Sequence, residues 1–231
     1  MNAVILAAGI GSRLGDITKT VPKPMVQIQG KPILEHNILL CKKYGIKDIY
    51  INLHHLPDVI IDYFGDGRKY GVKIHYHYEK EILGTAGALM PFQKSLIDSP
   101  FFVIYGDNFI DFDLLDLKIF HEKNIADISI LFHWRKDVMS SGIASFKGDD
   151  RIVKFIEKPI NIKKNGDWVN AGIYYISRSD LFEQINIFDD FGLNVFPRLL
   201  ENGYKIFGYK LHINLIAIDT LDLLSKNLTI K

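Results

Sequence analysis

Residues 6–25 read LAAGIGSRLGDITKTVPKPM, and they follow directly on a short apolar start. The spacing excludes the dinucleotide fingerprint G-x-G-x-x-G, because Leu14 stands where the third glycine is required. It also excludes the phosphate loop G-x-x-x-x-G-K-[ST], because the residues five beyond Gly9 and Gly11 are Leu14 and Asp16. What remains is a run of small residues after a strand, where backbone N–H groups can approach an anion closely. The segment predicts a polyphosphate site.

Two cations of this segment suit nucleotidyl transfer, a reaction that needs aligned reactants and neutralised phosphate charge rather than a protein nucleophile. Arg13 can grip a leaving pyrophosphate with its planar fork of donors. Lys23 lies between Pro22 and Pro24 in what is expected to be a stiff extended segment, and it can place a point charge on the transferred phosphate. The alternative is that both are surface charges on a loop.

Two aspartates stand where apolar strands are expected to end. Asp107 follows the run FFVIYG, and Asp219 closes NLIAI. Mg²⁺ is held in such sites by a few carboxylate oxygens together with phosphates and waters, so these residues are candidate magnesium ligands. Each aspartate taken singly also fits a helix cap or a turn.

Three further motifs carry polar groups at strand ends. EKEILGTAGAL, residues 79–89, places Thr85 at a strand-to-helix junction, where exposed N–H groups can contact a base or a sugar hydroxyl. FIEKP and VNAGIYY supply Glu157 and Asn170 for vicinal hydroxyls and Lys158 for a phosphate. A plain helix N-cap at Thr85, a surface ion pair and a bulge explain these residues as well.

The histidines and the cysteine indicate structural roles. His75 and His77 share one face of an expected strand, and His54 and His55 precede them in the sequence. No cysteine or further residue at a suitable spacing completes a set of metal ligands with these four histidines. The single cysteine, Cys41, cannot form an internal disulfide and is expected to be a buried thiol.

The pattern of apolar runs predicts alternating strands and helices in the first half of the chain. Strands are expected at 3–7, 48–53, 72–78 and 101–105, and helices at 33–44, 57–64 and 85–97. A helix near 113–123, strands at 126–132, 142–146, 151–156 and 169–176, helices at 178–185 and 193–202, strands near 204–217 and a helix near 220–227 are expected to follow. This order predicts an α/β fold with a mostly parallel sheet, helices on both faces and a strand-rich second half.

Composition sets limits on the partners. The chain has 231 residues, of which 48% are hydrophobic, and 28 basic residues stand against 27 acidic ones. That balance gives no large positive field for nucleic acid or an anionic membrane. No apolar run approaches a membrane span and no signal-peptide pattern precedes residue 2, so a cytoplasmic protein is expected. We expect one domain over 1–231, with a nucleotide-binding half, about 1–111, and a sugar-phosphate-binding half, about 112–231.

The motifs taken together resemble one family. The sequence contains, in order, L-A-A-G-x-G-S-R-L, P-K-P-M, L-G-T-A-G-A-L, Y-G-D, F-x-E-K-P, V-N-A-G-I-Y and I-D-T. From residue 3 to about 224 the chain resembles the sugar-1-phosphate nucleotidyltransferases, the NDP-sugar pyrophosphorylases. The first loop alone is also similar to methylerythritol and molybdopterin cytidylyltransferases, which lack the E-K-P and N-A-G motifs.

The resemblance implies a Rossmann-like three-layer α/β/α fold with a smaller strand-rich sugar-binding part, and polysaccharide biosynthesis as the setting. It implies a nucleoside triphosphate and a sugar 1-phosphate as partners, and it leaves homo-oligomers open. It implies the following roles: Mg²⁺ at Asp107 and Asp219; catalysis by Arg13, Lys23 and Asp107; nucleotide binding by Leu6, Ala7, Ala8, Gly9, Gly11, Ser12, Glu79, Gly84 and Thr85; sugar-phosphate binding by Gly142, Glu157, Lys158 and Asn170.

Within the family the chain looks most like mannose-1-phosphate and heptose-1-phosphate guanylyltransferases, so GTP is favoured. Asn194 departs from the usual D-F-G-x-D-V-F-P, and TLDLL replaces the usual G-T-P-E-D-L after Asp219 in a way that resembles choline-phosphate cytidylyltransferases. A cytidylyl-, uridylyl- or thymidylyltransferase, acting on another sugar phosphate or on a phosphocholine-like acceptor, therefore remains an alternative. A second alternative is a non-catalytic regulatory paralogue that binds a nucleotide sugar.

Overall fold

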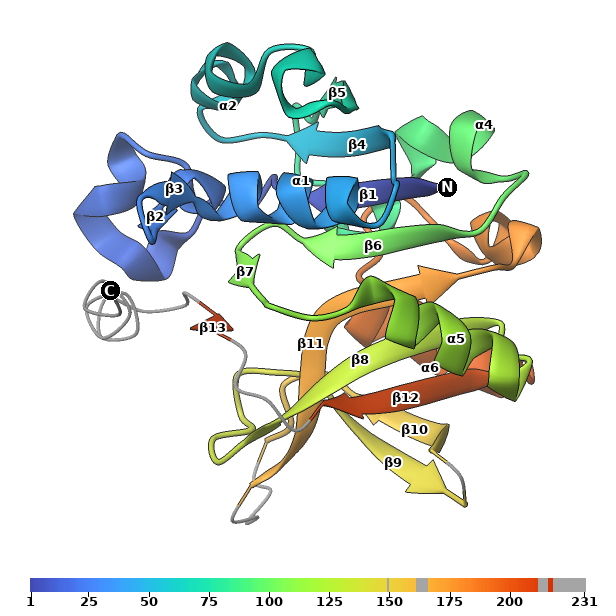
Figure 1. Cartoon of the computed structure of the whole chain (residues 1–231). Coiled ribbons are helices and arrows are strands. Elements are labelled where there is room, and N and C mark those ends of the chain that lie inside the picture. Colours follow the sequence, from blue (N-terminus) through green and yellow to red (C-terminus); the bar gives the residue numbers. More distant parts are fainter. Residues whose placement is uncertain (149, 161–165, 212–215, 218–231) are drawn as a thin grey trace. The chain divides into compact units, whose positions relative to one another are not determined.

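The computed structural model describes residues 1–148, 150–160, 166–211 and 216–217, and Figure 1 traces the chain. The chain divides into two compact units, each described by itself below. Unit 1 comprises Met1–Ile82 and Val103–Phe112 with the described residues 216–217. Unit 2 comprises Leu83–Phe102 and residues 113–211. The functional division into halves at about residue 111 stays a prediction.

Unit 1 is built on parallel strands. β1 (Asn2–Leu6) pairs in parallel with β4 (Asp48–Leu53), and β4 pairs in parallel with β5 (Lys73–Tyr78). β6 (Phe101–Tyr105), whose last three residues belong to unit 1, lies next to β1 in the strand order. The residues of β4 after Asp48 are buried, as expected for a strand covered on both faces.

The remaining elements of unit 1 connect these strands. The α-helices are α1 (Ile33–Lys43) and α2 (Pro57–Phe64), and the 3-10 segments are η1 (Ser12–Lys19), η2 (Lys23–Met25) and η3 (Arg68–Tyr70). The short strands β2 (Gln27–Ile28) and β3 (Lys31–Pro32) pair with each other, and β7 (Asn108–Phe109) pairs with β13 (Ile216–Ala217). The parallel register aligns Leu6 with Asn52 and Asn52 with His77, so the carboxyl ends of these strands share one edge.

Unit 2 contains a mixed sheet in the order β11-β8-β12-β10-β9. Its strands are β8 (Ile128–Arg135), β9 (Ile143–Lys147), β10 (Arg151–Ile156), β11 (Asp167–Ile176) and β12 (Ile206–Leu211). β12 and β8 are parallel, whereas the β8–β11, β10–β12 and β9–β10 pairs are antiparallel. β9 also pairs with β11, which brings the two ends of the strand order together.

Helices cover both faces of the unit 2 sheet. The helical segments are α3 (Gly84–Gly87), η4 (Met90–Phe92), α4 (Gln93–Leu96), α5 (Leu114–Asn124), η5 (Ser179–Gln184), the π-turn η6 (Phe191–Val195) and α6 (Phe196–Glu201). Tyr174 of β11 packs its ring on Phe196 of α6, with centroids 5.1 Å apart. Tyr175 packs on His121 of α5 at 4.8 Å. Successive strand residues point to opposite faces, so α5 and α6 cover opposite faces.

The α/β class is confirmed, and the structure corrects several element boundaries. The expected helix over 85–97 consists of α3, η4 and α4, because Pro91 cannot donate a backbone hydrogen bond inside a helix. The expected helix over 193–202 begins as the π-turn η6, and the one over 178–185 is the 3-10 segment η5. The helix expected near 220–227 lies outside the described residues.

Candidate functional site

In unit 1, the end of β6 meets the end of β1 through Gly106. The N–H of Gly106 donates to the carbonyl oxygen of Leu6 at 2.9 Å. A Cβ at position 106 would lie 2.8 Å from that oxygen, so a side chain there would push the two strand ends apart. Asp107 follows at once, and its carboxylate accepts from the ammonium of Lys23. Lys23 and Asp107, which were predicted separately from the sequence, are therefore brought together beside the end of β1.

Lys23 is held in place by its surroundings. The residue is only 6% exposed, although its charged end forms the ion pair with Asp107. Pro22 and Pro24 flank it, but the extended conformation expected at Lys23 is wrong. Only Pro22 is extended, with φ −59° and ψ 144°, and Lys23 begins the 3-10 segment η2, in which Pro24 is tolerated because it lies in the first turn. A long cationic side chain that is buried and paired has few alternative rotamers, so its charge occupies a defined position.

The glycine loop packs directly against Lys23. Gly11 has φ +69°, and a Cβ at this position would lie 2.9 Å from Cβ of Lys23 and 3.0 Å from Cγ2 of Thr18. The hydroxyl of Thr18 donates to the carbonyl oxygens of Gly11 at 3.3 Å and Gly15 at 3.1 Å. At Gly9, in contrast, a Cβ would meet no atom of the described residues within 4 Å. The loop thus combines a fixed end at Gly11 with an approachable backbone at Gly9.

Asn52, which the sequence interpretation missed, contacts two predicted site residues. Its Oδ1 accepts from the N–H of Ala7 at 2.9 Å, and its Nδ2 donates to Oε1 of Glu79 at 2.8 Å. Ala7 and Glu79 are both predicted nucleotide-binding residues, and Asn52 connects them. The available signal was an amide at the end of an otherwise apolar strand, DIYINL.

Glu79 is 1% exposed and is fixed through its backbone as well as its side chain. Its N–H donates to the carbonyl oxygen of Leu53 at 2.7 Å, and its own carbonyl oxygen lies 2.8 Å from Nδ1 of His54. His55 likewise contacts the carbonyl oxygen of Thr18, with Nε2 2.6 Å away. The two histidines therefore tie loops together, in agreement with the predicted structural roles.

The roles predicted for Ser12 and Arg13 stay predictions, and both residues lie in η1. Asp219, the second predicted magnesium ligand, lies outside the described residues. Leu6 and Ala8 belong to the end of β1 and the residues that follow it, and Ala8 is 4% exposed.

The donor set around Asp107 fits Mg²⁺ bound together with phosphates. Within the described part of the chain, no group of three or more His, Cys, Asp or Glu side chains forms a metal cage. Mg²⁺ does not require such a cage, because one or two carboxylates with substrate phosphates and waters complete its octahedron. The carboxylate of Asp107 remains 28% exposed beside Lys23 and fits this requirement, and its role as a magnesium ligand stays a prediction.

In unit 2, the N–H groups at the Gly84–Gly87 turn donate hydrogen bonds to a segment that is distant in the sequence. Asp190 Oδ1 accepts from both the N–H and the hydroxyl of Thr85, each at 3.0 Å. The carbonyl oxygen of Asp189 accepts from the N–H groups of Ala86 at 2.9 Å and Gly87 at 3.0 Å. These N–H groups are therefore not exposed, contrary to the expectation from sequence, and Thr85 is not a side-chain N-cap. The nucleotide roles of Gly84 and Thr85 stay predictions.

The carboxyl group of Glu157 lies between two glycines. A Cβ at Gly142 would lie 2.6 Å from Oε2 of Glu157, and a Cβ at Gly192 would lie 2.9 Å from its Cδ. Burial raises the pKa of this carboxyl, Lys158 lowers it and Asp190 raises it further. Glu157 is thus a half-buried carboxylate whose space depends on the absence of neighbouring side chains.

Asn170 joins Gly142 through the backbone, because its N–H donates to the carbonyl oxygen of Gly142 at 2.8 Å. Its Nδ2 donates to the hydroxyl of Tyr174 at 2.8 Å, and its Oδ1 accepts from the N–H of Gly172 at 2.9 Å. Tyr174 is a second residue that the sequence interpretation missed. The predicted sugar-site residues Gly142, Glu157 and Asn170 are brought together within unit 2.

Lys158 and Asn194 each take part in a local backbone structure. Lys158 has φ +46°, is exposed and donates its N–H to Ser141 O at 3.2 Å. Asn194, the departure from the usual aspartate, accepts from the N–H of Asp190 through Oδ1 at 2.8 Å. An amide oxygen and a carboxylate oxygen can both accept this bond, so the departure preserves the local structure.

Other candidate groups have structural environments. His75 Nε2 lies 3.0 Å from Oδ1 of Asp48, and its ring stacks on Tyr50. Cys41 is fully buried, as predicted, and burial raises the pKa of its thiol to about 12. A thiol in that state is not a nucleophile at neutral pH.

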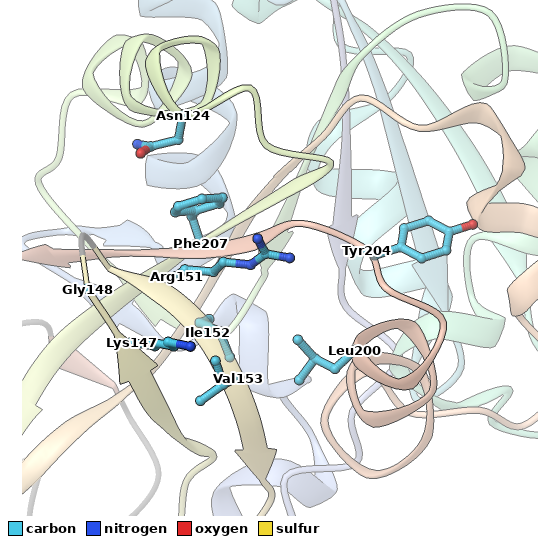
Figure 2. A pocket seen from close by; sticks show the side chains of 9 residues that line it. All are labelled: Asn124, Lys147, Gly148, Arg151, Ile152, Val153, Leu200, Tyr204 and Phe207. Atoms are coloured by element: carbon cyan, nitrogen blue, oxygen red, sulfur yellow. The ribbon is translucent and has the colours of Figure 1, made fainter.

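Figure 2 shows a pocket of about 670 Å³ in unit 2. No predicted site residue lines it, and both of its cations, Lys147 and Arg151, are exposed rather than buried. The lining residues are Asn124, Lys147, Gly148, Arg151, Ile152, Val153, Leu200, Tyr204 and Phe207. The pocket therefore belongs to the surface of unit 2 and not to the predicted site.

Comparisons with known proteins agree on one family. The family model for nucleotidyl transferases matches residues 2–213. The UTP–glucose-1-phosphate uridylyltransferase of Synechocystis sp. is 34% identical over 94% of this chain and 60% of its own length. The mannose-1-phosphate guanyltransferase of Yarrowia lipolytica is 36% identical over 78% of this chain and 50% of its own length. The chain thus spans little more than half the length of these two relatives.

Two further proteins are similar over nearly all of their length. The D-glycero-alpha-D-manno-heptose 1-phosphate guanylyltransferase of Campylobacter jejuni is 36% identical over 89% of this chain and 87% of its own length. The crystal structure of HddC from Yersinia pseudotuberculosis, complexed with GMP-PN, matches with a TM-score of 0.80 at 27% identity, and covers 98% of this chain and 97% of that one. Within the described residues, no helix is both long and apolar enough to cross a membrane.

Proposed function

The chain belongs to the nucleotidyl transferase family, and we propose that it is an enzyme that condenses a nucleoside triphosphate with a hexose or heptose 1-phosphate. An oxygen of the sugar phosphate attacks the α-phosphorus, the bond from that phosphorus to the oxygen bridging the β-phosphate breaks, and pyrophosphate leaves with the electron pair. The observation that carries the proposal is the Lys23–Asp107 pair beside the glycine loop.

Lys23 and Asp107 have complementary roles in this proposal. The ammonium of Lys23 neutralises charge that develops on the transferred phosphate, where a fixed cation stabilises the transition state without reorganisation. Asp107 orients Lys23 and holds Mg²⁺, which when bound supplies further neutralisation of the polyphosphate. Asp219 is proposed as the second ligand and Arg13 as the contact to the leaving pyrophosphate.

The nucleotide is proposed to lie along the end of β1. Residues 6–12 offer the backbone, with the open approach at Gly9, while the N–H of Ala7 is already used by Asn52. Asn52 in turn orients the carboxylate of Glu79. A buried carboxylate held by an amide is suited to select a base or a ribose hydroxyl by hydrogen bonds.

The acceptor is proposed to be a sugar bound by Gly142, Glu157, Lys158 and Asn170. Glu157 provides acceptor oxygens in a space bounded by two glycines, and the hydroxyls of a sugar match such a group. Lys158, the adjacent exposed cation, suits the phosphate of the acceptor. A phosphocholine-like acceptor is the competing proposal.

We favour GTP as the donor. The Yersinia pseudotuberculosis structure was obtained with GMP-PN, and two of the relatives are guanylyl or guanyl transferases of mannose and heptose phosphates. The Synechocystis relative uses UTP by name, which keeps the other bases in the test. The finer expectations belong to the same proposal: a Rossmann-like three-layer arrangement, a cytoplasmic location near the triphosphate pool, and polysaccharide biosynthesis as the use of the product.

A matrix of triphosphates and acceptors tests the proposal. Pyrophosphate release is measured with GTP, ATP, CTP, UTP and dTTP against mannose, glucose and heptose 1-phosphates and against phosphocholine. We expect turnover with GTP and a mannose or heptose phosphate. Turnover confined to phosphocholine would overturn the sugar assignment, and nucleotide-sugar binding without any turnover would favour the regulatory alternative.

A further inference from the structure

The segment that contains residues 189–192 contacts two motifs of unit 2 that have separate predicted roles. On one side it meets the Gly84–Gly87 turn, for which nucleotide binding is predicted. On the other side it meets Glu157, for which acceptor binding is predicted. No role had been predicted for the segment itself.

The contact with the turn is dense. Asp190 Oδ1 accepts two hydrogen bonds from Thr85, and the hydroxyl of Thr85 accepts from the N–H of Phe191 at 2.9 Å. Gly84 has φ +80°, and a Cβ there would lie 2.9 Å from the carbonyl oxygen of Phe188. Glycine is therefore required both by the backbone angle and by the approach of the segment. The conformation of the turn depends on what the segment offers to it.

The contact with Glu157 is steric. Gly192 has no side chain where the carboxyl of Glu157 lies, and a Cβ there would also lie 3.2 Å from Cβ of Glu157. The space available to the carboxyl of Glu157 thus depends on residue 192.

The segment is itself anchored. The buried Asp189 accepts from Nη1 of Arg198 at 2.8 Å and from the N–H of Asn186 at 2.9 Å. Phe191 is fully buried against Tyr174, with ring centroids 5.1 Å apart. Asn194 closes the π-turn by accepting from the N–H of Asp190. An anchored segment can transmit a position to its neighbours, because it does not relax independently.

We infer that residues 189–192 position both substrate-binding motifs of unit 2, with Asp190 setting the Gly84–Gly87 turn and Gly192 setting Glu157. This inference rests on the proposed function for the roles of those motifs. It makes Asp190 and Gly192 positioning residues for nucleotidyl transfer, each acting through a different neighbour. Substitution of Asp190 is therefore expected to affect the triphosphate, and substitution of Gly192 the sugar phosphate.

The test compares Asp190→Ala, Asp190→Asn and Gly192→Ala with a matched control, Asp113→Ala. Asp113 is also a unit 2 carboxylate that accepts a backbone N–H at a helix start, from Leu115 at 2.8 Å, and it belongs to no predicted site. Steady-state kinetics are measured with the wild-type substrate pair below the melting temperature of each variant. Direct binding of GTP is measured by calorimetry.

We expect Asp190→Ala to raise the KM and Kd for the triphosphate by about tenfold, while Asp190→Asn, which keeps the acceptor oxygen, stays within about threefold. We expect Gly192→Ala to raise the KM for the sugar phosphate instead. If Asp190→Ala fails to fold, Thr85→Val replaces it, because this variant removes the hydrogen bonds of the Thr85 hydroxyl to Asp190 and Phe191. We expect Thr85→Val to weaken the binding of the triphosphate and not that of the sugar phosphate.

Asp190→Ala with the same substrate constants as Asp113→Ala would overturn the inference and leave the segment purely structural. Loss of the proposed function has a different signature, because the wild type itself would release no pyrophosphate. In that case the calorimetric Kd for GTP still decides, since weaker binding is expected in Asp190→Ala than in Asp113→Ala. Equal binding in the two variants would then overturn the inference.

Discussion

The ammonium of Lys23 pairs with the carboxylate of Asp107, although the two residues are 84 positions apart in the sequence. The pair forms because Gly106 brings the end of β6 to the end of β1, and because Gly11 leaves room for the stem of Lys23. A buried cation at a defined position is what neutralisation of a transferring phosphate requires.

Lys23→Ala is expected to lower kcat by about a hundredfold or more, with a smaller change in the KM for the sugar phosphate, because the cation acts on transition-state charge. Steady-state kinetics at saturating triphosphate measure the split. Lys19→Ala is the control, since Lys19 forms an exposed pair with Asp16 at 2.7 Å. An unchanged kcat with a raised KM would assign Lys23 to ground-state binding.

Gly11→Ala tests the packing of the loop on Lys23. The substitution adds a Cβ in the left-handed region and 2.9 Å from Cβ of Lys23, so it is expected to lower both stability and kcat. Gly30→Ala is the matched control, because Gly30 has φ +78° but a Cβ there would meet nothing within 4 Å among the residues that the structure describes. Both variants are expected to lose about 1 kcal/mol through backbone strain. The melting temperatures of the two variants measure that shared loss. Equal kcat in the two variants would contradict the role of the contact.

Asn52→Leu is expected to raise the KM for the triphosphate and to destabilise unit 1 by about 1 to 3 kcal/mol, because Ala7 and Glu79 lose their common partner. Asn37 of α1 supplies the control, since its buried amide has no hydrogen-bond partner within the described residues. Asn37→Leu is expected to preserve stability and KM in chemical unfolding and kinetic assays. Indistinguishable triphosphate constants for the two variants would remove Asn52 from the site.

Acid is expected to destabilise unit 2 through two histidines. Burial lowers the pKa of His121 and of His133 from 6.5 to about 4, and Arg135 also lowers that of His133. The unfolded chain therefore binds more protons between these values. The free energy of unfolding is retained above pH 6.5 and falls as the pH drops towards 4.

Each of these histidines contributes up to about 1.4 kcal/mol per pH unit to the slope. Urea unfolding at about pH 7.5 and about pH 5 measures the loss in the free energy of unfolding. We expect His121→Gln to reduce the pH dependence of that free energy by the contribution of about one proton. The same slope in the wild type and the variant would exclude His121 as a source.

The strands and the chemistry of unit 1 could be predicted from sequence because the signals are local. The strands expected over 3–7, 48–53 and 101–105 end within one residue of the observed ends at Leu6, Leu53 and Tyr105. The motif glycine Gly11 has the positive φ that its residue type suggests, whereas the proline-flanked Lys23 begins a 3-10 segment and is not extended as expected. The family resemblance supplied the site assignment, and the family is confirmed by the comparisons.

The partners of the motifs could not be predicted, because they come from distant segments. The sequence predicts a helix cap or a ligand contact at Thr85, but the hydroxyl and the N–H of Thr85 both donate to Asp190, 105 positions away. Asn52 reads as one polar residue in a strand, and only the register of β1 and β4 reveals that it reaches Ala7. The expected helix over 85–97 is broken at Pro91, because proline has no backbone N–H to donate inside a helix.

Pyrophosphate release by wild type and Asp107→Asn, each with Mg²⁺ and with a chelator, tests the central claim most directly. The substrates are GTP and the sugar 1-phosphate that gives the highest turnover. The account predicts rapid release by the wild type with Mg²⁺, no release in chelator, and a loss of at least about a hundredfold in Asp107→Asn, because the carboxylate both orients Lys23 and holds the metal. Full turnover in chelator or in Asp107→Asn would contradict it.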